Sequence, residues 1–186
     1  MPDTDEREPL TWLVLAYRVP SEPTRLRAAV WRKLKSLGAV YLQSSVAAAP
    51  RTARSERTLR ALRNEIVETM SGQAFLMSTS SVIGEGDLVA LYNAARDDEY
   101  EEILDKCADF HEGVAKEVRA RHYTYGELEE NEEDLTKLRG WYEKVRARDV
   151  LGAARGKDVV KALDECAKTL EGFAASVYQA EDDAVS

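Results

Sequence analysis

The residues best suited to chemistry in this sequence are arginines, which bind phosphate and other oxyanions through paired N–H donors. They gather in the first third of the chain: residues 1–63 hold 12 Lys and Arg against 6 Asp and Glu, whereas the remainder holds 14 against 28. The net charge of -8 therefore conceals a basic front and an acidic back. The basic front predicts a polyanion or oxyanion as partner, and the acidic back predicts a solvated helical module or a mask for the basic surface.

Helical spacing places many of these cations on exposed faces. Arg27, Trp31 and Lys35 are four residues apart, so they form a row of cation, aromatic ring and cation. This row is either a solvated face on which Trp31 packs against another helix or subunit, or a face that contacts a polyanion. The candidate residues for binding DNA or another anion are Arg18, Arg25, Arg27, Trp31, Arg32, Lys35, Arg54, Arg57 and Arg60.

The last three candidates lie in the first turns of a helix expected over residues 52–71. Cations at a helix N-terminus oppose the macrodipole, and broken local rules are more frequent at functional sites than elsewhere. Arg54, Arg57 and Arg60 therefore indicate an anion-binding surface. The alternative is an exposed basic face that pairs with the acidic half of the chain.

The elements that must position these residues begin with residues 12–17, WLVLAY, whose consecutive apolar residues predict a central strand buried on both faces. Ser21 is expected to cap the following helix, with Pro23 in its first turn and Gly38 after its end. The expected buried stripe of this helix is Leu26, Val30, Leu34 and Leu37, and that of the 52–71 helix is Leu59, Leu62, Ile66 and Met70.

Alternating residues over 40–46 predict a second strand, and residues 73–80 predict a third. The order is β-α-β-α-β, or β-α-β-β-α-β if residues 47–50, or a piece near Ile83 or Tyr123, supply a further strand. Two helices on one face of a small sheet form the ferredoxin-like arrangement, so we expect an α+β protein with such a core. The other face needs cover, which points to dimerisation or to the remainder of the chain.

From about residue 84 onward only helical periodicity is present, and heptad-like apolar spacing predicts an antiparallel hairpin. Its two helices are expected over residues 127–148 and 157–180. The expected organisation is a disordered tail over residues 1–9, a ferredoxin-like domain over 10–83 and an all-helical domain over 84–186.

No constellation typical of an enzyme stands out, because the chain has no phosphate-binding glycine loop, no CxxC and no GxSxG. Cys107 with His111 and His122 could form a metal or redox site, but Cys107 and Cys166 both occupy apolar helical positions, which favours core packing. The acidic start, MPDTDEREP, is unlike a signal peptide, and no apolar run of about 18 residues could cross a bilayer. We expect a cytoplasmic protein that needs neither metal nor cofactor.

Three separated stretches resemble the N-terminal domain of ChrB, the regulator of bacterial chromate-resistance operons. They are YRVPSEPTRLRAAVWRKLKSLGAVYLQSSV, ELEENEEDLTKLRGWYEKVRARD over residues 127–149, and the closing FAASVYQAE. The resemblance implies a non-enzymatic, DNA-binding transcriptional regulator, with chromate or a similar oxyanion as a possible effector. We expect it to act as a homodimer.

The front half also resembles the ferredoxin-like domain of PaaX-type transcriptional regulators and of small CRISPR adaptation endoribonucleases. Those nucleases carry an acidic residue at the end of the first strand to hold a metal, whereas this chain has Ala16, Tyr17 and Arg18 there. A nuclease of that type is therefore not expected. Two alternatives to a DNA-binding regulator stay open: an oxyanion-binding or chromate-detoxification accessory protein, and a protein-interaction module whose helical hairpin binds a partner helix.

Overall fold

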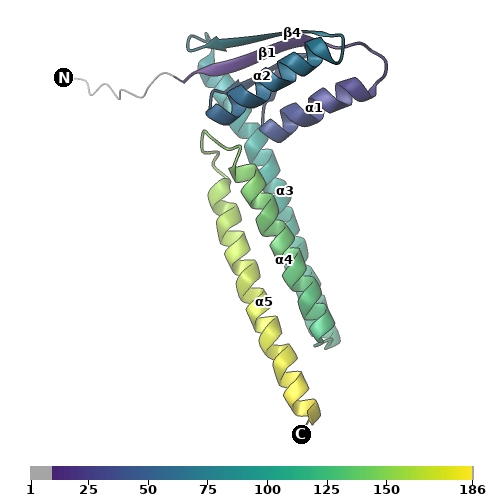
Figure 1. The fold of residues 1–186 in the computed structure, drawn as a ribbon. Helices are drawn as coiled ribbons and strands as arrows, with labels where there is room; N and C mark the ends of the chain where they lie inside the picture. Colours follow the sequence, from purple (N-terminus) through teal and green to yellow (C-terminus); the bar gives the residue numbers. More distant parts are fainter. Residues whose placement is uncertain (1–9, 186) are drawn as a thin grey trace, which may run out of the picture. The chain divides into compact units, whose positions relative to one another are not determined.

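The computed structural model describes residues 10–185, so the expected tail over residues 1–9 lies outside the described part. Within it, a β-α-β-β-α-β segment is followed by three long helices (Figure 1). The elements are β1 (Trp12–Arg18), α1 (Arg25–Leu37), β2 (Val40–Gln43), β3 (Val46–Pro50), α2 (Ala53–Glu68), β4 (Gln73–Thr79), α3 (Glu85–Ala120), α4 (Tyr125–Arg146) and α5 (Gly156–Val185). The predicted α+β class with a helical C-terminal region is confirmed.

The four strands form one antiparallel sheet in the order β2-β3-β1-β4. This order, with two helices on one face, is the ferredoxin-like arrangement. Strand β1 is central, since Ala16 pairs with Val46 of β3 on one side and with Phe75 of β4 on the other. The continuous apolar run of β1 is explained by this position, because neither face of the strand is fully open to water.

Helices α1 and α2 cover one face of the sheet and form its main core (Figure 1). Successive strand residues point to opposite faces, so Leu13 and Leu15 of β1 enter this core together. Burial of each large side chain contributes about 1.5–3 kcal/mol. The buried set is Leu13, Leu15, Val30, Leu34, Leu37, Ala47, Ala49, Leu59, Leu62, Ile66, Met70 and Ala74, which contains both predicted helical stripes apart from the partly buried Leu26.

The opposite face of the sheet is covered in part by the first turns of α3. Trp12 is fully buried there: its ring lies edge-on to that of Tyr92, with 6.0 Å between centroids. The indole Nε1 donates a hydrogen bond to Glu85 Oε1 over 3.3 Å. The start of α3 therefore belongs to the packing of the sheet.

The predicted start of the first helix was wrong. Helix α1 begins at Arg25 with Thr24 as its N-cap residue, and Ser21 makes no cap. The first helical contact is the bond from the Leu26 amide to the Pro23 carbonyl at 3.0 Å, so the residues before Pro23 belong to the loop after β1.

The strand predicted over residues 40–46 is in fact divided into β2 and β3. The break follows a register shift between Tyr41 and Gln43, and Ser45 takes a left-handed conformation with φ of 68° to reverse the chain. Residues 47–50 supply the extra strand that the β-α-β-β-α-β alternative required, and that alternative is confirmed.

Helix α2 ends at Glu68, three residues before the predicted end at residue 71. Gly72 serves a close approach of backbones: a Cβ atom there would lie 2.4 Å from the carbonyl oxygen of Arg18. Only glycine permits that contact, which holds the end of β1 against the start of β4.

The chain divides into two compact units, one ending at Tyr92 and the other beginning at Asn93. In the second unit α3, α4 and α5 share a core that includes Cys107, Phe110 and Cys166. Helices α4 and α5 run antiparallel (Figure 1). Glu99 of α3 forms an ion pair with the buried Arg96 of the same helix at 3.1 Å. It also accepts a hydrogen bond at 3.0 Å from Nε of Arg148, which follows α4.

Candidate nucleic-acid interface

Helix α1 turns one face to the sheet and the other to solvent. Its apolar residues Val30, Leu34 and Leu37 are buried, and the polar side is therefore held outward by core packing alone. Five of the predicted binding residues lie on that exposed side of α1: Arg25, Arg27, Trp31, Arg32 and Lys35.

The row of Arg27, Trp31 and Lys35 exists in the folded chain. Lys35 Nζ lies 5.1 Å from the centroid of the Trp31 ring, which is a cation–π distance. The ring itself is 48% exposed, so Trp31 is available at the surface of its unit. A large aromatic ring beside cations can stack on a base or support a phosphate contact.

Helix α2 begins with a capping box, in which the Ser55 amide donates to Thr52 Oγ1 at 3.0 Å and the Thr52 amide donates to Ser55 Oγ at 2.8 Å. Glu56 follows in the first turn, between Arg60 and Arg51, which lie 2.6 and 2.8 Å from it. These two hydrogen bonds, that of Arg60 first, lower the pKa of the Glu56 carboxyl. The charge of Arg60 is thus largely compensated.

The other cations predicted for the site have no such compensation. Among residues 10–185, none of Arg18, Arg25, Arg27, Arg32, Lys35, Arg54 and Arg57 forms an ion pair with a carboxylate. Residues 18–79, from the end of β1 to the end of β4, contain 11 Lys and Arg against 4 Asp and Glu, so cations outnumber the counter-charges on these elements. Within residues 10–92 the first unit therefore presents several cations that have no carboxylate partner, which favours an anionic partner.

A groove between α1 and α2 brings two of these cations together. It has a volume of about 310 Å³ and is lined by Ala29, Arg32, Lys33, Ser36, Leu37, Arg54 and Thr58. Lys33 is exposed and pairs with Glu65 of α2 across the two helices. Arg32 of α1 and Arg54 of α2 line opposite walls, and neither forms an ion pair within the described part of the chain.

A second, more polar cavity lies at the end of β1. Its volume is about 570 Å³, and its lining includes Arg18, Arg27, Ser71, Gly72 and Gln73. The two arginines come from different elements, Arg18 from β1 and Arg27 from α1. The close approach of Gly72 to the Arg18 carbonyl oxygen places the start of β4 beside the same cavity.

A third groove, of about 650 Å³, runs between α2 and β4. Arg60 lines it together with Arg51 and Arg63, two cations that were not predicted as site residues. Arg63 donates from Nη1 to Asn64 Oδ1 at 3.2 Å. The positive charge of Arg51 and Arg63 was the signal in the sequence that could have identified them. Only the packing of α2 beside β4 shows that they line this groove.

The predicted residues thus do not converge on one pocket. Arg18 and Arg27 share one cavity, Arg32 and Arg54 share the α1–α2 groove, and Arg60 lies in the α2–β4 groove. Arg25, Arg57, Trp31 and Lys35 lie exposed on the same two helices. The arrangement is an extended basic layer with local hollows, which suits a long polyanion better than a single small ion.

The cysteines of the second unit are buried in its core. Cys166 Sγ lies 3.6 Å from His111 Nε2, and Thr169 Oγ1 lies 3.0 Å from His111 Nδ1. Burial raises the pKa of the Cys166 thiol to about 12, which keeps this group protonated at neutral pH. His122 lies elsewhere and contacts Glu117 at 2.9 Å. Residues 10–185 contain no cluster of three His, Cys, Asp or Glu side chains arranged to hold a metal ion.

None of the helices within residues 10–185 has the length and apolarity needed to cross a bilayer. Comparison with curated proteins and with solved structures finds no match. The family model described as "Protein ChrB, N-terminal" matches residues 27–184, which is most of the chain and includes α2 and all of α1 from Arg27 onward. The resemblance seen in the sequence is thereby confirmed: the chain belongs to the ChrB N-terminal family and is related to chromate resistance.

Proposed function

We propose that this protein is a non-enzymatic regulator of chromate resistance that acts in the cytoplasm and binds DNA through the basic layer of α1 and α2. The proposal rests on the cations of two adjacent helices that form no ion pair within residues 10–185, in an otherwise acidic chain. Cations without protein partners keep their charge available for phosphate groups, and phosphate contacts supply most of the non-specific affinity for DNA.

The groove between α1 and α2 supports phosphate binding in particular. Arg32 and Arg54 line opposite walls, and Lys33 lies beside them. A guanidinium group can donate two parallel hydrogen bonds to one phosphate, so two guanidinium groups on facing walls can hold a strand at a defined position. Trp31 and Lys35 extend the same layer along α1 and offer a ring for stacking.

Phosphate contacts position a protein on DNA but do not select a sequence. The proposal therefore assigns the basic layer to affinity and orientation, and assigns no base-reading residue.

The test is fluorescence anisotropy of duplex DNA from upstream of the protein's own gene, titrated at two salt concentrations, with scrambled DNA of equal length as control. Tighter binding to the upstream DNA, weakened by salt, supports a regulator. Release on addition of chromate, but not on addition of sulfate, makes the chain a sensor. Absence of binding at low salt refutes the proposal.

A second candidate function, the binding of a small oxyanion, is favoured by one observation. Arg18 and Arg27 come from different elements and line the same polar cavity at the end of β1. Isothermal titration calorimetry with chromate, sulfate and phosphate tests it. Loss of the binding heat in Arg18→Gln but not in Arg54→Gln places the anion in this cavity, whereas no heat with any of the three anions removes this candidate.

A further inference from the structure

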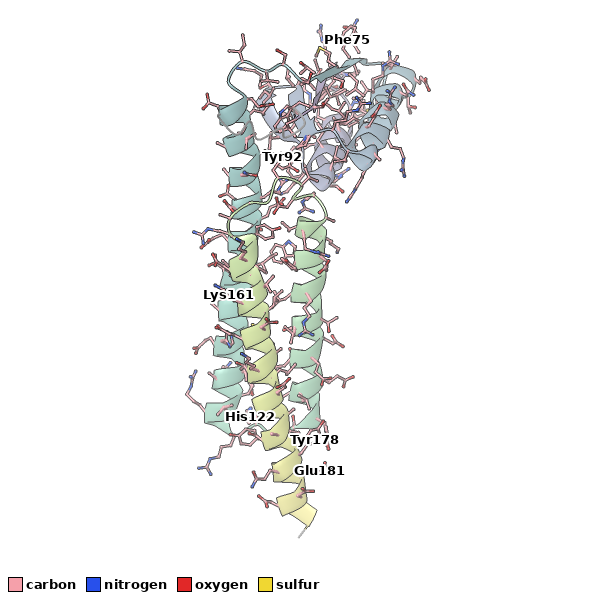
Figure 2. All side chains as sticks on the ribbon, turned by 90° about the vertical axis from the view of Figure 1, so that its left-hand side faces the viewer. Phe75, Tyr92, His122, Lys161, Tyr178 and Glu181 are labelled. Atoms are coloured by element: carbon pink, nitrogen blue, oxygen red, sulfur yellow. The ribbon has the colours of Figure 1, made fainter. Side chains whose placement is uncertain are left out.

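The face of the sheet opposite α1 and α2 is only half covered. At one end of this face, the first turns of α3 bury the Trp12 side chain completely. Toward β4 the same face stays open. Phe75, labelled in Figure 2, is 68% exposed. Met77 is 49% exposed. Both side chains lie on this face because they pair with Ala16 and Val14 of β1, residues on the same side of the pleat as Trp12.

Strand β4 is also an unpaired edge of the sheet, since its only neighbour in the described residues is β1. Exposed edges are usually protected by charged residues, proline or a bulge, because an open edge pairs readily with another strand. The stretch QAFLMSTSSVIG, residues 73–84, contains no charged residue and no proline, although 32% of the chain is charged. The other edge strand, β2, is short and carries the register shift at Tyr41, so it has the protection that β4 lacks.

We propose that β4 pairs antiparallel with β4 of a second copy of this chain, across a two-fold axis at Leu76. The argument for a second copy is that this strand is self-complementary. Strand β4 runs from Gln73 to Thr79, so an axis through its central residue pairs all seven residues. The same register places Phe75 of each copy opposite Met77 of the other.

This pairing would cover the exposed apolar side chains of β4 and would also pair the free backbone groups of its edge. Residues opposite each other in an antiparallel pair share a face, so the two exposed side chains meet on the side away from α1 and α2. A thioether against an aromatic ring is a favourable contact, and both side chains leave water. The edge amide and carbonyl groups gain partners, and the contact closes after two copies, as a two-fold interface requires.

The dimer has a consequence for DNA that rests on the proposed function. Two copies carry two basic layers related by the same two-fold axis, and a symmetric protein of this kind matches a DNA site made of two half-sites.

Sedimentation velocity of the full chain, without DNA, over a range of concentrations tests the proposal. We expect a dimer for the unchanged chain. Phe75→Glu should weaken the dimer by at least about tenfold, because the contact across the axis is disrupted twice and each 1.4 kcal/mol corresponds to a tenfold change. The matched control is Val118→Glu, an equally drastic change at an exposed apolar residue of α3, which should leave the dimer intact.

The register has its own test. In the double variant Phe75→Glu with Met77→Lys, an axis at Leu76 sets each new carboxylate opposite a new ammonium group of the other copy, so dimerisation should recover in low salt. Circular dichroism checks that each variant is folded, and Met77→Glu replaces Phe75→Glu if the latter is not.

A monomeric unchanged chain overturns the proposal, as does a dimer that Phe75→Glu does not weaken; failure of the double variant to recover overturns the register. The outcomes are separable from those for DNA: a dimer that binds no DNA refutes only the proposed function, and a monomer that binds DNA refutes only the dimer.

Discussion

Neutralising Arg32 and Arg54 together should flatten the salt dependence of DNA binding. The two guanidinium groups line the same groove between α1 and α2, and neither has a carboxylate partner within residues 10–185. Each is therefore free to displace a condensed counter-ion from the DNA. Arg32→Gln with Arg54→Gln keeps polar side chains at exposed positions, so the fold should not be affected.

The size of the effect follows from counter-ion release. Each phosphate contact contributes about 0.9 to the slope of log K against log salt concentration, so loss of two contacts lowers the slope by about 1.8. Between roughly 50 and 200 mM salt, the unchanged chain should then lose about 12-fold more affinity than the double variant.

The assay is fluorescence anisotropy of one labelled duplex at four or more salt concentrations. Arg60→Gln on the same helix is a matched control, because Arg60 is already paired with Glu56 at 2.6 Å and has less charge to offer the DNA. It should lower the slope by less than half of the change seen in the double variant. Lys106→Gln, whose lysine pairs with Asp109 at 2.7 Å in the second unit, should leave the slope unchanged.

An unchanged slope in the folded double variant contradicts the reasoning. If Arg60→Gln lowered the slope as much as the double variant does, the reasoning would also be contradicted. Ion pairing with a carboxylate would then not decide which cations bind phosphate.

Three further predictions concern stability and reactivity. Trp12→Ala should destabilise the chain by about 3–5 kcal/mol, because it empties a fully buried site against Tyr92; urea denaturation measures this, and a loss below about 1 kcal/mol would show that α3 does not close over the sheet. Arg60 and Arg51 lower the pKa of Glu56 in the folded chain, so the stability it contributes is present above its ordinary value of 4.5 and is lost as the pH falls through the lowered value. Thermal unfolding of Glu56→Gln should accordingly depend less on pH in the acidic range, and an unaltered acid dependence would rule this out. Burial raises the pKa of Cys166 to about 12, so a thiol reagent at pH 8 should label Cys107 and Cys166 only after unfolding; rapid labelling of the folded chain would count against their burial.

Much of the fold could be read from local patterns. The apolar run of β1 and the stripes of α1 and α2 were correctly assigned, because residue periodicity specifies which face of an element leaves water. Errors fell where local signals were ambiguous. Ser21 is a good capping residue by type, but the helical bonds begin only after Pro23. The alternation over residues 40–46 continued through a reversal at Ser45, which periodicity alone does not reveal.

The candidate site shows the same division. The sequence by itself determined that the front of the chain is basic and that its cations lie on the polar faces of two helices. Only the tertiary structure decided that Arg32 and Arg54 line one groove, that Arg18 and Arg27 line one cavity, and that α3 covers Trp12 but leaves Phe75 exposed. The physical reason is that side-chain periodicity fixes the direction a residue faces within its own element, whereas the neighbour it meets depends on strand order and long-range packing.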